Sequence, residues 1–271
     1  MTEEKWEQRC VFGSEGSRPG EFFGAWDIAA RQPDEVAVAE IWNKRVAICS
    51  IDGNQKSTIP MERWARGIAA TRTGNLLVVV EHSASYVKVF DKDNTLAFQF
   101  PTVPPSEVDK TAVDLQSVAA KTDGTIVVGD VKRMVLTEHS PTDGELRSTI
   151  PVKIKPCYVA VDSNDRVVIS DCKQQLVGVV GTNGDTLFTI KPTIDGEVVR
   201  RCTGVCADST GVYVAMHNDD EDTGHIHHYD PQGGFLHCIA EGLHYPLGIT
   251  FTADGQLAVA DFYSVKIYDF V

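Results

Sequence analysis

The sequence predicts an all-β fold, a six-bladed β-propeller, on three observations. A short apolar segment recurs six times, with its central positions at residues 28, 68, 118, 159, 205 and 249. Its average spacing of about 44 residues is that of a four-stranded propeller blade. Turn signals rich in Gly, Asn and Asp separate short β-rich runs, which indicates strands rather than helices. We therefore expect residues 1–271 to form one propeller domain.

Each repeat is expected to supply four strands. In the first repeat these are the apolar segment around Ile28, the runs 36–39 and 46–49, and a fourth strand over 56–59. Turn-forming residues separate the strands, and Gly, Asn and Asp among them supply the positive φ that tight hairpin turns require. Examples of these predicted turns are Pro33-Asp34, Asp52-Gly53, Gly74-Asn75, Asp93-Asn94, Asp143-Gly144, Asn183-Gly184 and Gly233-Gly234. The six repeats span approximately 26–64, 65–113, 114–154, 155–200, 201–243 and 244–271.

The two ends of the chain are expected to meet in one blade. The sixth repeat stops after its third strand, at 265–269, whereas a spare strand over 8–13 precedes the first repeat. A β-strand left at an open sheet edge is prone to pair with other chains, and closing the ring removes that edge. We therefore expect the N-terminal strand to complete the last blade.

The first repeat resembles an NHL repeat. A glycine-rich lead-in over 12–22 precedes the first strand, Trp26-Asp27-Ile28-Ala29, as in that family. The run Val36-Ala37-Val38-Ala39-Glu40, followed by Asn43-Lys44-Arg45-Val46, is similar to the core of the NHL pattern. Later repeats keep fragments such as Val259-Ala260-Asp261, but the fifth lacks the acidic residue and reads Met216-His217-Asn218. The resemblance covers nearly the whole chain.

This resemblance carries a functional expectation. NHL propellers of this size form the C-terminal domain of tripartite-motif ubiquitin ligases, after RING, B-box and coiled-coil segments. The resemblance implies a non-catalytic module that recognises a substrate or another protein partner, with any ligase activity in a longer parent chain. Some relatives bind RNA, so an RNA-binding propeller acting in post-transcriptional regulation is the alternative.

The charge balance limits the classes of partner. The chain has 25 Lys and Arg against 38 Asp and Glu, a formal net charge of −13. Non-specific nucleic-acid and anionic-membrane binding need a basic surface, so we expect neither a DNA nor a membrane partner. No signal peptide is visible, and the seven scattered cysteines suit reduced thiols, which together predict a cytoplasmic protein.

Topology predicts where a partner binds. In an up-and-down blade, the loops between the second and third strands share a face with the connections between blades. Arg and aromatic residues, which are favoured at protein interfaces and also stack on RNA, are enriched in these segments. The candidate binding residues are Trp42, Lys44, Arg45, Arg66, Tyr86, Lys132, Arg133, Tyr158, Lys173, Arg201, Phe262 and Tyr263.

Structural roles compete with this interpretation. Four acids close their second strands and each has a cation nearby: Glu40 with Arg45, Asp130 with Lys132, Asp171 with Lys173, and Asp261 with Lys266. Ion pairs within a blade are the favoured interpretation for Arg45, and exposed pairs of this kind contribute roughly 0–1 kcal/mol each. Trp42 could be exposed or packed between blades, whereas Trp26 and Trp64 are expected to pack inside.

The fifth repeat contains an acidic run, Asp219 to Asp222, followed by His225, His227 and His228. Carboxylates suit Ca²⁺, and imidazoles suit Zn²⁺ or Cu²⁺. Alternate residues of a strand point to opposite sides, so His228 cannot join the other two. A solvated loop is therefore favoured, and no metal or cofactor is expected.

Catalysis has little support in the sequence. No nucleophile elbow, zincin or phosphate-loop motif is present. A metal-dependent propeller hydrolase or lyase, the remaining alternative, needs ligands around the central channel. The residues just before the first strands, Arg66, Gln116, Tyr158, Thr203 and Leu247, form no acidic ring. We therefore do not expect the domain itself to be an enzyme.

Overall fold

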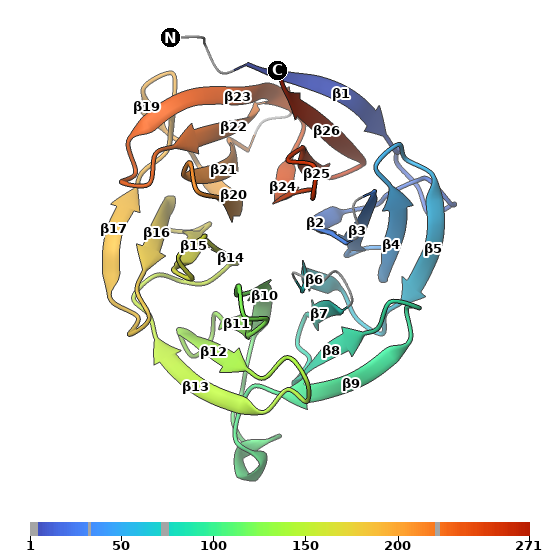
Figure 1. Ribbon diagram of the computed structural model, residues 1–271, viewed down its shortest axis with the longest axis vertical. Helices are drawn as coiled ribbons and strands as arrows, with labels where there is room; N and C mark the ends of the chain where they lie inside the picture. Colours follow the sequence, from blue (N-terminus) through green and yellow to red (C-terminus); the bar gives the residue numbers. More distant parts are fainter. Residues whose placement is uncertain (1–4, 32–33, 72–75, 220–222) are drawn as a thin grey trace.

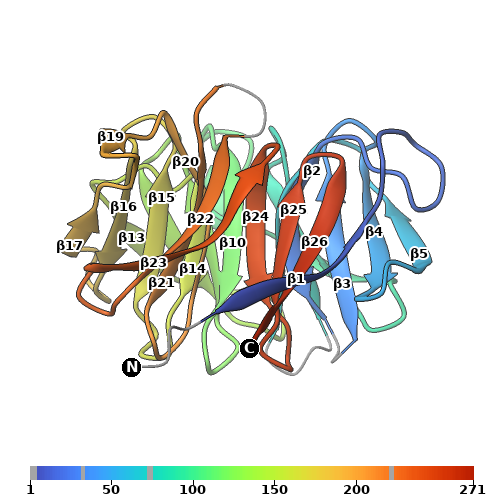
Figure 2. The ribbon, with the colours of Figure 1, turned by 90° about the horizontal axis from the view of Figure 1, so that it is seen from above.

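The computed structural model describes residues 5–31, 34–71, 76–219 and 223–271. Six four-stranded antiparallel sheets stand as blades around a central channel (Figure 1), and the side view shows a short disc (Figure 2). The predicted all-β, six-bladed propeller is confirmed. Pro33 of the first predicted turn, the Gly74-Asn75 turn and the acids Asp220 to Asp222 lie outside the described residues.

The strands follow the chain from the channel outward in blades one to five. Blade one contains β2 (Ala25–Ala30), β3 (Glu35–Glu40), β4 (Arg45–Ser50) and β5 (Gln55–Pro60). Blade two contains β6 (Ala65–Ala70), β7 (Leu77–Glu81), β8 (Tyr86–Phe90) and β9 (Leu96–Pro101). Blade three contains β10 (Leu115–Ala120), β11 (Ile126–Asp130), β12 (Val135–His139) and β13 (Leu146–Pro151). Blade four contains β14 (Tyr158–Val161), β15 (Val167–Asp171), β16 (Leu176–Val180) and β17 (Thr186–Ile190). Blade five contains β20 (Arg201–Ala207), β21 (Val212–His217), β22 (Gly224–Tyr229) and β23 (Phe235–Leu243).

Blade six joins the two ends of the chain, as predicted. It contains β24 (Pro246–Phe251), β25 (Leu257–Asp261), β26 (Ser264–Phe270) and, outermost, β1 (Trp6–Phe12). β1 runs antiparallel to β26, with Trp6 opposite Phe270 and Phe12 opposite Val265. β1 and β26, from opposite ends of the chain, lie side by side at the rim in Figure 1. Gly53, at φ +91° in the β4–β5 turn, packs so closely on Phe12 that an added Cβ would lie 2.6 Å from the Phe12 Cβ.

Apolar packing between blades explains the strand patterns. Second strands lie between two neighbouring sheets, and all residues of β7, β11, β15, β21 and β25 are buried. Outer strands such as β5 alternate between more and less exposed residues because one side faces solvent. The described residues form six apolar clusters, one between each pair of neighbouring blades. The core is therefore a ring of interfaces around the channel.

Two short elements lie between blades and were not predicted. A 3-10 turn, η1 (Pro105–Glu107), follows blade two, and a hairpin of β18 (Thr193–Ile194) and β19 (Glu197–Val198) follows blade four. The described residues include no helix with the length and hydrophobicity required to cross a membrane.

Deletion of residues 1–13 should prevent stable folding. It removes β1, exposes the edge of β26 and takes away the Trp6 ring, which packs against Phe270 at 5.5 Å and Tyr213 at 6.3 Å between ring centroids. Size-exclusion chromatography and thermal unfolding should show aggregation or loss of the cooperative transition. A chain lacking only residues 1–4 is the control, and a monomeric Δ1–13 chain with unchanged melting would refute the closure.

Candidate partner-binding face

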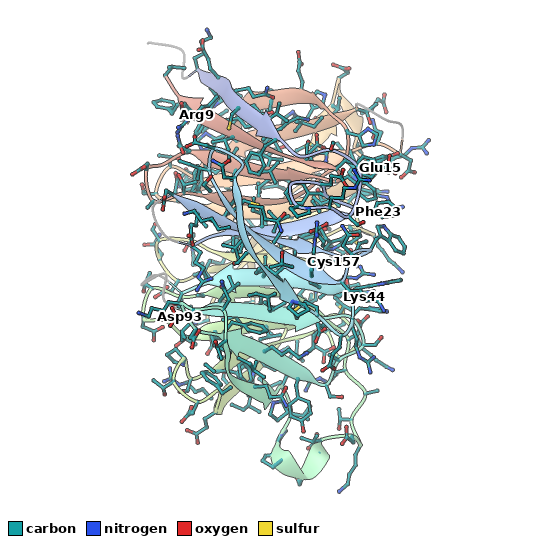
Figure 3. All side chains as sticks on the ribbon, turned by 90° about the vertical axis from the view of Figure 1, so that its right-hand side faces the viewer. Arg9, Glu15, Phe23, Lys44, Asp93 and Cys157 are labelled. Atoms are coloured by element: carbon teal, nitrogen blue, oxygen red, sulfur yellow. The ribbon has the colours of Figure 1, made fainter. Side chains whose placement is uncertain are left out.

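The loops between second and third strands present their side chains on one face. Residues 41–44, 131–134 and 172–175 are four-residue loops that end at positive φ, which is 48° at Lys44 and 55° at Met134. The second loop position is Trp42 in blade one, Lys132 in blade three and Lys173 in blade four. Figure 3 shows Lys44 and Phe23 on this face, whereas Asp93 of the β8–β9 turn lies on the other.

Buried carboxylates hold this face together. Glu40, at the end of β3, accepts a hydrogen bond from the Phe23 N–H at 3.0 Å, and Glu81 accepts one from the Arg63 N–H at 2.7 Å. Asp261 accepts the Tyr245 N–H at 2.7 Å. Asp130 and Asp171 bind their incoming connections in the same way. Each carboxylate therefore ties the chain entering a blade to the end of that blade's second strand.

The cations of the face mostly neutralise these acids. Arg45 pairs with Glu40, as favoured from the sequence, and also donates to the Glu21 carbonyl at 2.6 Å. Lys266 pairs with Asp261. These pairs are not the weak, exposed kind that we expected, because the carboxylates are at most 2% exposed. Arg45 is thus occupied in fixing the glycine-rich lead-in.

Two of the expected pairings are wrong. Asp130 pairs with the Arg133 guanidinium at 2.5 Å instead of with Lys132, and Asp171 accepts the backbone N–H of Lys173 rather than its ammonium. Both Lys side chains are exposed, and among the described residues neither forms an ion pair. Arg201 forms an exposed pair with Asp219 at 3.0 Å.

Aromatic side chains form a continuous run over blades two, one and six, which we call the aromatic arc. Trp42 lies 5.1 Å from Trp64 and 6.1 Å from Phe23 between ring centroids, and Phe23 stacks on Tyr263 at 6.1 Å. Trp42 and Phe23, in the middle of the run, are 48% and 37% exposed. In order, the arc consists of His82, Trp64, Trp42, Phe23, Tyr263, His244 and Tyr245.

Interior residues lie beneath the face, at the end of the channel. The Arg66 guanidinium is 4.7 Å from the Trp26 ring centroid and 5.9 Å from that of Trp64. Trp26 packs against the cluster between blades four and five, so the ring crosses the channel from blade one. Tyr158 is 7% exposed and lines the channel rather than the outer face.

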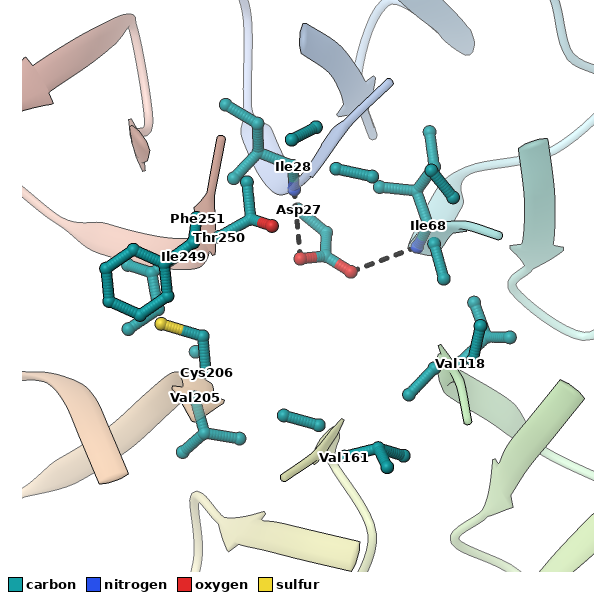
Figure 4. Close-up of a pocket in the computed structure, with 18 of the residues that line it drawn as sticks. Asp27, Ile28, Ile68, Val118, Val161, Val205, Cys206, Ile249, Thr250 and Phe251 are labelled. Atoms are coloured by element: carbon teal, nitrogen blue, oxygen red, sulfur yellow. Dashed lines mark hydrogen bonds between the residues drawn. The ribbon is translucent and has the colours of Figure 1, made fainter. Parts of the chain in front are cut away.

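The channel is a cavity of about 810 Å³ that reaches the hairpin-turn end of the inner strands. Asp27 is the only carboxylate among the described lining residues, and it accepts the Ile28 N–H at 2.9 Å and the Ile68 N–H at 3.0 Å (Figure 4). Burial raises the pKa of the Asp27 carboxyl to about 7, although the two N–H donors oppose this shift. Asp27 therefore links the inner strands of blades one and two.

The structure brings together only part of the candidate set. Trp42 and Tyr263 lie in the aromatic arc, and Phe262 packs on Tyr263 with 4.8 Å between centroids. Lys44, Lys132 and Lys173 lie in equivalent loops of three blades, and Tyr86 begins β8 in a half-buried position. The candidate set did not include Phe23, Trp64, His82, His244 or Tyr245, and Trp64, which we expected to pack inside, is a half-buried member of the arc. Phe23, Trp64, His244 and Tyr245 lie in the connections that lead to a first strand. The repeat alignment identifies these positions, so they could have been found from the sequence.

The chain resembles known proteins along most of its length. No protein-family model matches the chain. The chain is 25% identical to human E3 ubiquitin-protein ligase TRIM32 over 300 aligned positions, which cover 97% of this chain and 45% of that protein. The mouse protein of the same name matches at 25% over 296 positions. This match confirms the resemblance to tripartite-motif proteins. The chain spans less than half the length of these relatives.

Solved structures with low sequence identity share the fold alone. A streptogramin B lyase structure matches with a TM-score of 0.64 and 11% identity, covering 99% of this chain and 98% of the other. A structural genomics protein of unknown function from Bacteroides thetaiotaomicron matches with a TM-score of 0.75 and 15% identity, covering 98% and 77%.

Replacement of Asp130 with Ala should lower the free energy of unfolding by about 3 kcal/mol. It leaves the partly buried Arg133 guanidinium without its carboxylate partner and removes the acceptor of the Asp114, Lys132 and Arg133 backbone N–H groups. Urea denaturation measures the change. Asp254→Ala, which removes an exposed turn carboxylate, is the control, and an equal small effect of both variants would contradict the structural role.

Asp27 should make stability fall as pH rises from about 4 to about 7. In this range the unfolded carboxyl has lost its proton whereas the folded one, with its pKa raised to about 7, retains it. The unfolding free energy of the wild type relative to that of Asp27→Asn should fall through this window and be flat above it, because Asn does not titrate. Urea denaturation at a series of pH values gives this difference, and a pH-independent difference would disprove the shift.

Proposed function

We propose that this chain is a non-catalytic protein-recognition propeller and that its partner binds the aromatic arc. The observation that carries the proposal is the exposure of Trp42 and Phe23 at the centre of a run of packed rings. Contiguous exposed apolar patches mark interaction sites, and Trp and Tyr are the most frequent energetic anchors of protein interfaces.

Rigidity supports this use of the arc. The Glu40 carboxylate binds the Phe23 N–H and the Asn43 amide, so the segments that carry Phe23 and Trp42 share one buried acceptor. Asp261 holds the connection that carries His244 and Tyr245. Side chains whose backbone is already ordered lose less conformational entropy on binding. The arc therefore suits a preformed docking surface for a protein segment that inserts apolar side chains.

The likeness to TRIM32 supports a more specific role. We infer that the propeller is the substrate- or partner-binding module of a tripartite-motif-type ubiquitin ligase. Because the chain spans 45% of those relatives, ubiquitin transfer would belong to another part of a longer protein. Asp27 is already engaged by N–H groups of two blades, and we assign the channel no catalytic role. A cytoplasmic location remains a prediction.

RNA binding is the second candidate, and one observation favours it. Lys132 and Lys173 project from equivalent loops of blades three and four without an ion pair among the described residues. These cations lie on the part of the face that the arc does not cover. Pairing of Arg45, Arg133 and Lys266 with buried acids weakens the potential that an RNA backbone needs. Protein recognition is therefore the better supported function.

A photoreactive amino acid at position 44, which is exposed in the same loop as Trp42, should crosslink the chain to a protein in lysate, and the crosslink should survive RNase. The same probe at position 187 is the control, because Leu187 is 52% exposed on β17, the outer strand of blade four. Trp42→Ala should weaken binding of the identified protein at least about 30-fold, as for an interface hot spot. Leu187→Ala should leave the affinity unchanged.

Two outcomes would contradict the proposal. Equal crosslinking from positions 44 and 187 would show that the arc is not the binding surface. Crosslinks to RNA would favour the second candidate. So would protein crosslinks that are lost both after RNase treatment and, separately, in the Lys132→Ala/Lys173→Ala double variant.

A further inference from the structure

The outer hairpin of blade five brings three metal-binding side chains together. His225 and His227 are two residues apart on β22 and point to the same side, and the register of the hairpin places Cys238 of β23 opposite His227. His228 points to the other side, as predicted, and stacks on Tyr213 with 4.1 Å between centroids. The sequence interpretation considered only the histidines and missed Cys238, because the cysteine comes from the neighbouring strand.

The distances suit a tetrahedral ion. One donor atom from each of the three residues lies within 4.8 Å of the other two. His225 Nδ1 is 3.7 Å from Cys238 Sγ. Zn–S and Zn–N bonds of about 2.3 and 2.0–2.1 Å at tetrahedral angles separate sulfur and nitrogen ligands by about 3.6 Å. His225 Nδ1 and Cys238 Sγ are therefore already separated by about the distance between two zinc ligands.

The surroundings hold one imidazole in place. The Tyr229 hydroxyl lies 3.4 Å from His227 Nδ1, which leaves Nε2 of that ring for an ion. Tyr229 is buried in the cluster between blades four and five, and Phe235 packs on His227 with 5.1 Å between centroids. Such outer contacts fix the orientation of ligating histidines in metal sites.

We propose that His225, His227 and Cys238 bind one Zn²⁺ ion per chain. Two imidazoles and a thiolate are ligands that Zn²⁺ prefers, and three protein ligands leave a fourth position for water or another ligand. His227 also lines a cleft of about 420 Å³, together with Thr193, Asp195 and Lys191 of the segment after blade four. The site belongs to the contact between blades four and five, whereas the aromatic arc covers blades six, one and two.

Cobalt provides a direct test, because a thiolate bound to Co²⁺ gives a charge-transfer absorption band that imidazole ligands do not. Titration of the purified, chelator-treated 271-residue chain under reducing conditions should give this band with tetrahedral d–d bands, saturating at one Co²⁺ per chain. Zn²⁺ should displace the cobalt and raise the melting temperature. Cys238→Ser should abolish the band, and His225→Ala should weaken affinity more than the roughly 10–100-fold typical of losing an outer contact.

Another thiol pair provides the matched control. Cys157 and Cys172 have their Sγ atoms 3.2 Å apart, in blade four, and Cys172→Ser should leave the cobalt spectrum unchanged. Circular dichroism of the metal-free variants shows whether they fold. If one ligand variant fails to fold, the other still tests the site, since His225 is half-buried and Cys238 is exposed. The proposal is overturned if the wild type gives no thiolate band, or if Cys172→Ser removes the band and Cys238→Ser does not.

Discussion

A buried carboxylate at the end of the second strand is the interaction on which the binding face depends. In five blades it accepts backbone N–H groups from the connection that enters the blade. Unpaired N–H groups at these buried sites would cost about 1–3 kcal/mol each. In blade five, where His217 replaces the acid, the Asn218 side-chain oxygen accepts the Arg200 N–H at 3.1 Å. The next residue thus performs a similar role there.

The same carboxylates determine the electrostatics of the face. Because they are buried, their charge attracts nearby cations strongly, and Arg45, Lys88, Arg133 and Lys266 pair with them. These cations are therefore engaged in ion pairs that stabilise the loops and are not free to bind a partner. What remains is a face with two chemistries: aromatic rings over blades six, one and two, and exposed lysines over blades three and four. The face therefore contains two separate candidate binding regions, one aromatic and one basic.

Polar groups between blades serve other purposes elsewhere in the ring. Asp27 joins the inner strands of two blades by accepting an N–H group from each. Arg31, 2% exposed, donates to the Asp91 carbonyl at 2.7 Å and so links blade one to a turn of blade two. The contacts of His225, His227 and Cys238 on the outer hairpin of blade five include Tyr229 and the Ala240 carbonyl, which belong to the same hairpin. This local arrangement differs from the polar contacts of Asp27 and Arg31, which join two blades.

The sequence by itself determined the repeat, the strand order and the closing of the ring. These follow from local signals, since the spacing of apolar segments and the Gly, Asn and Asp turns are properties of consecutive residues. Only the tertiary structure decided that Asp130 pairs with Arg133 and not Lys132, and that Phe23, Trp42 and Tyr263 meet in one arc. It also decided that Cys238 joins His225 and His227. Loop conformation and contacts between strands set these relations, because they depend on distances in space rather than on positions along the chain.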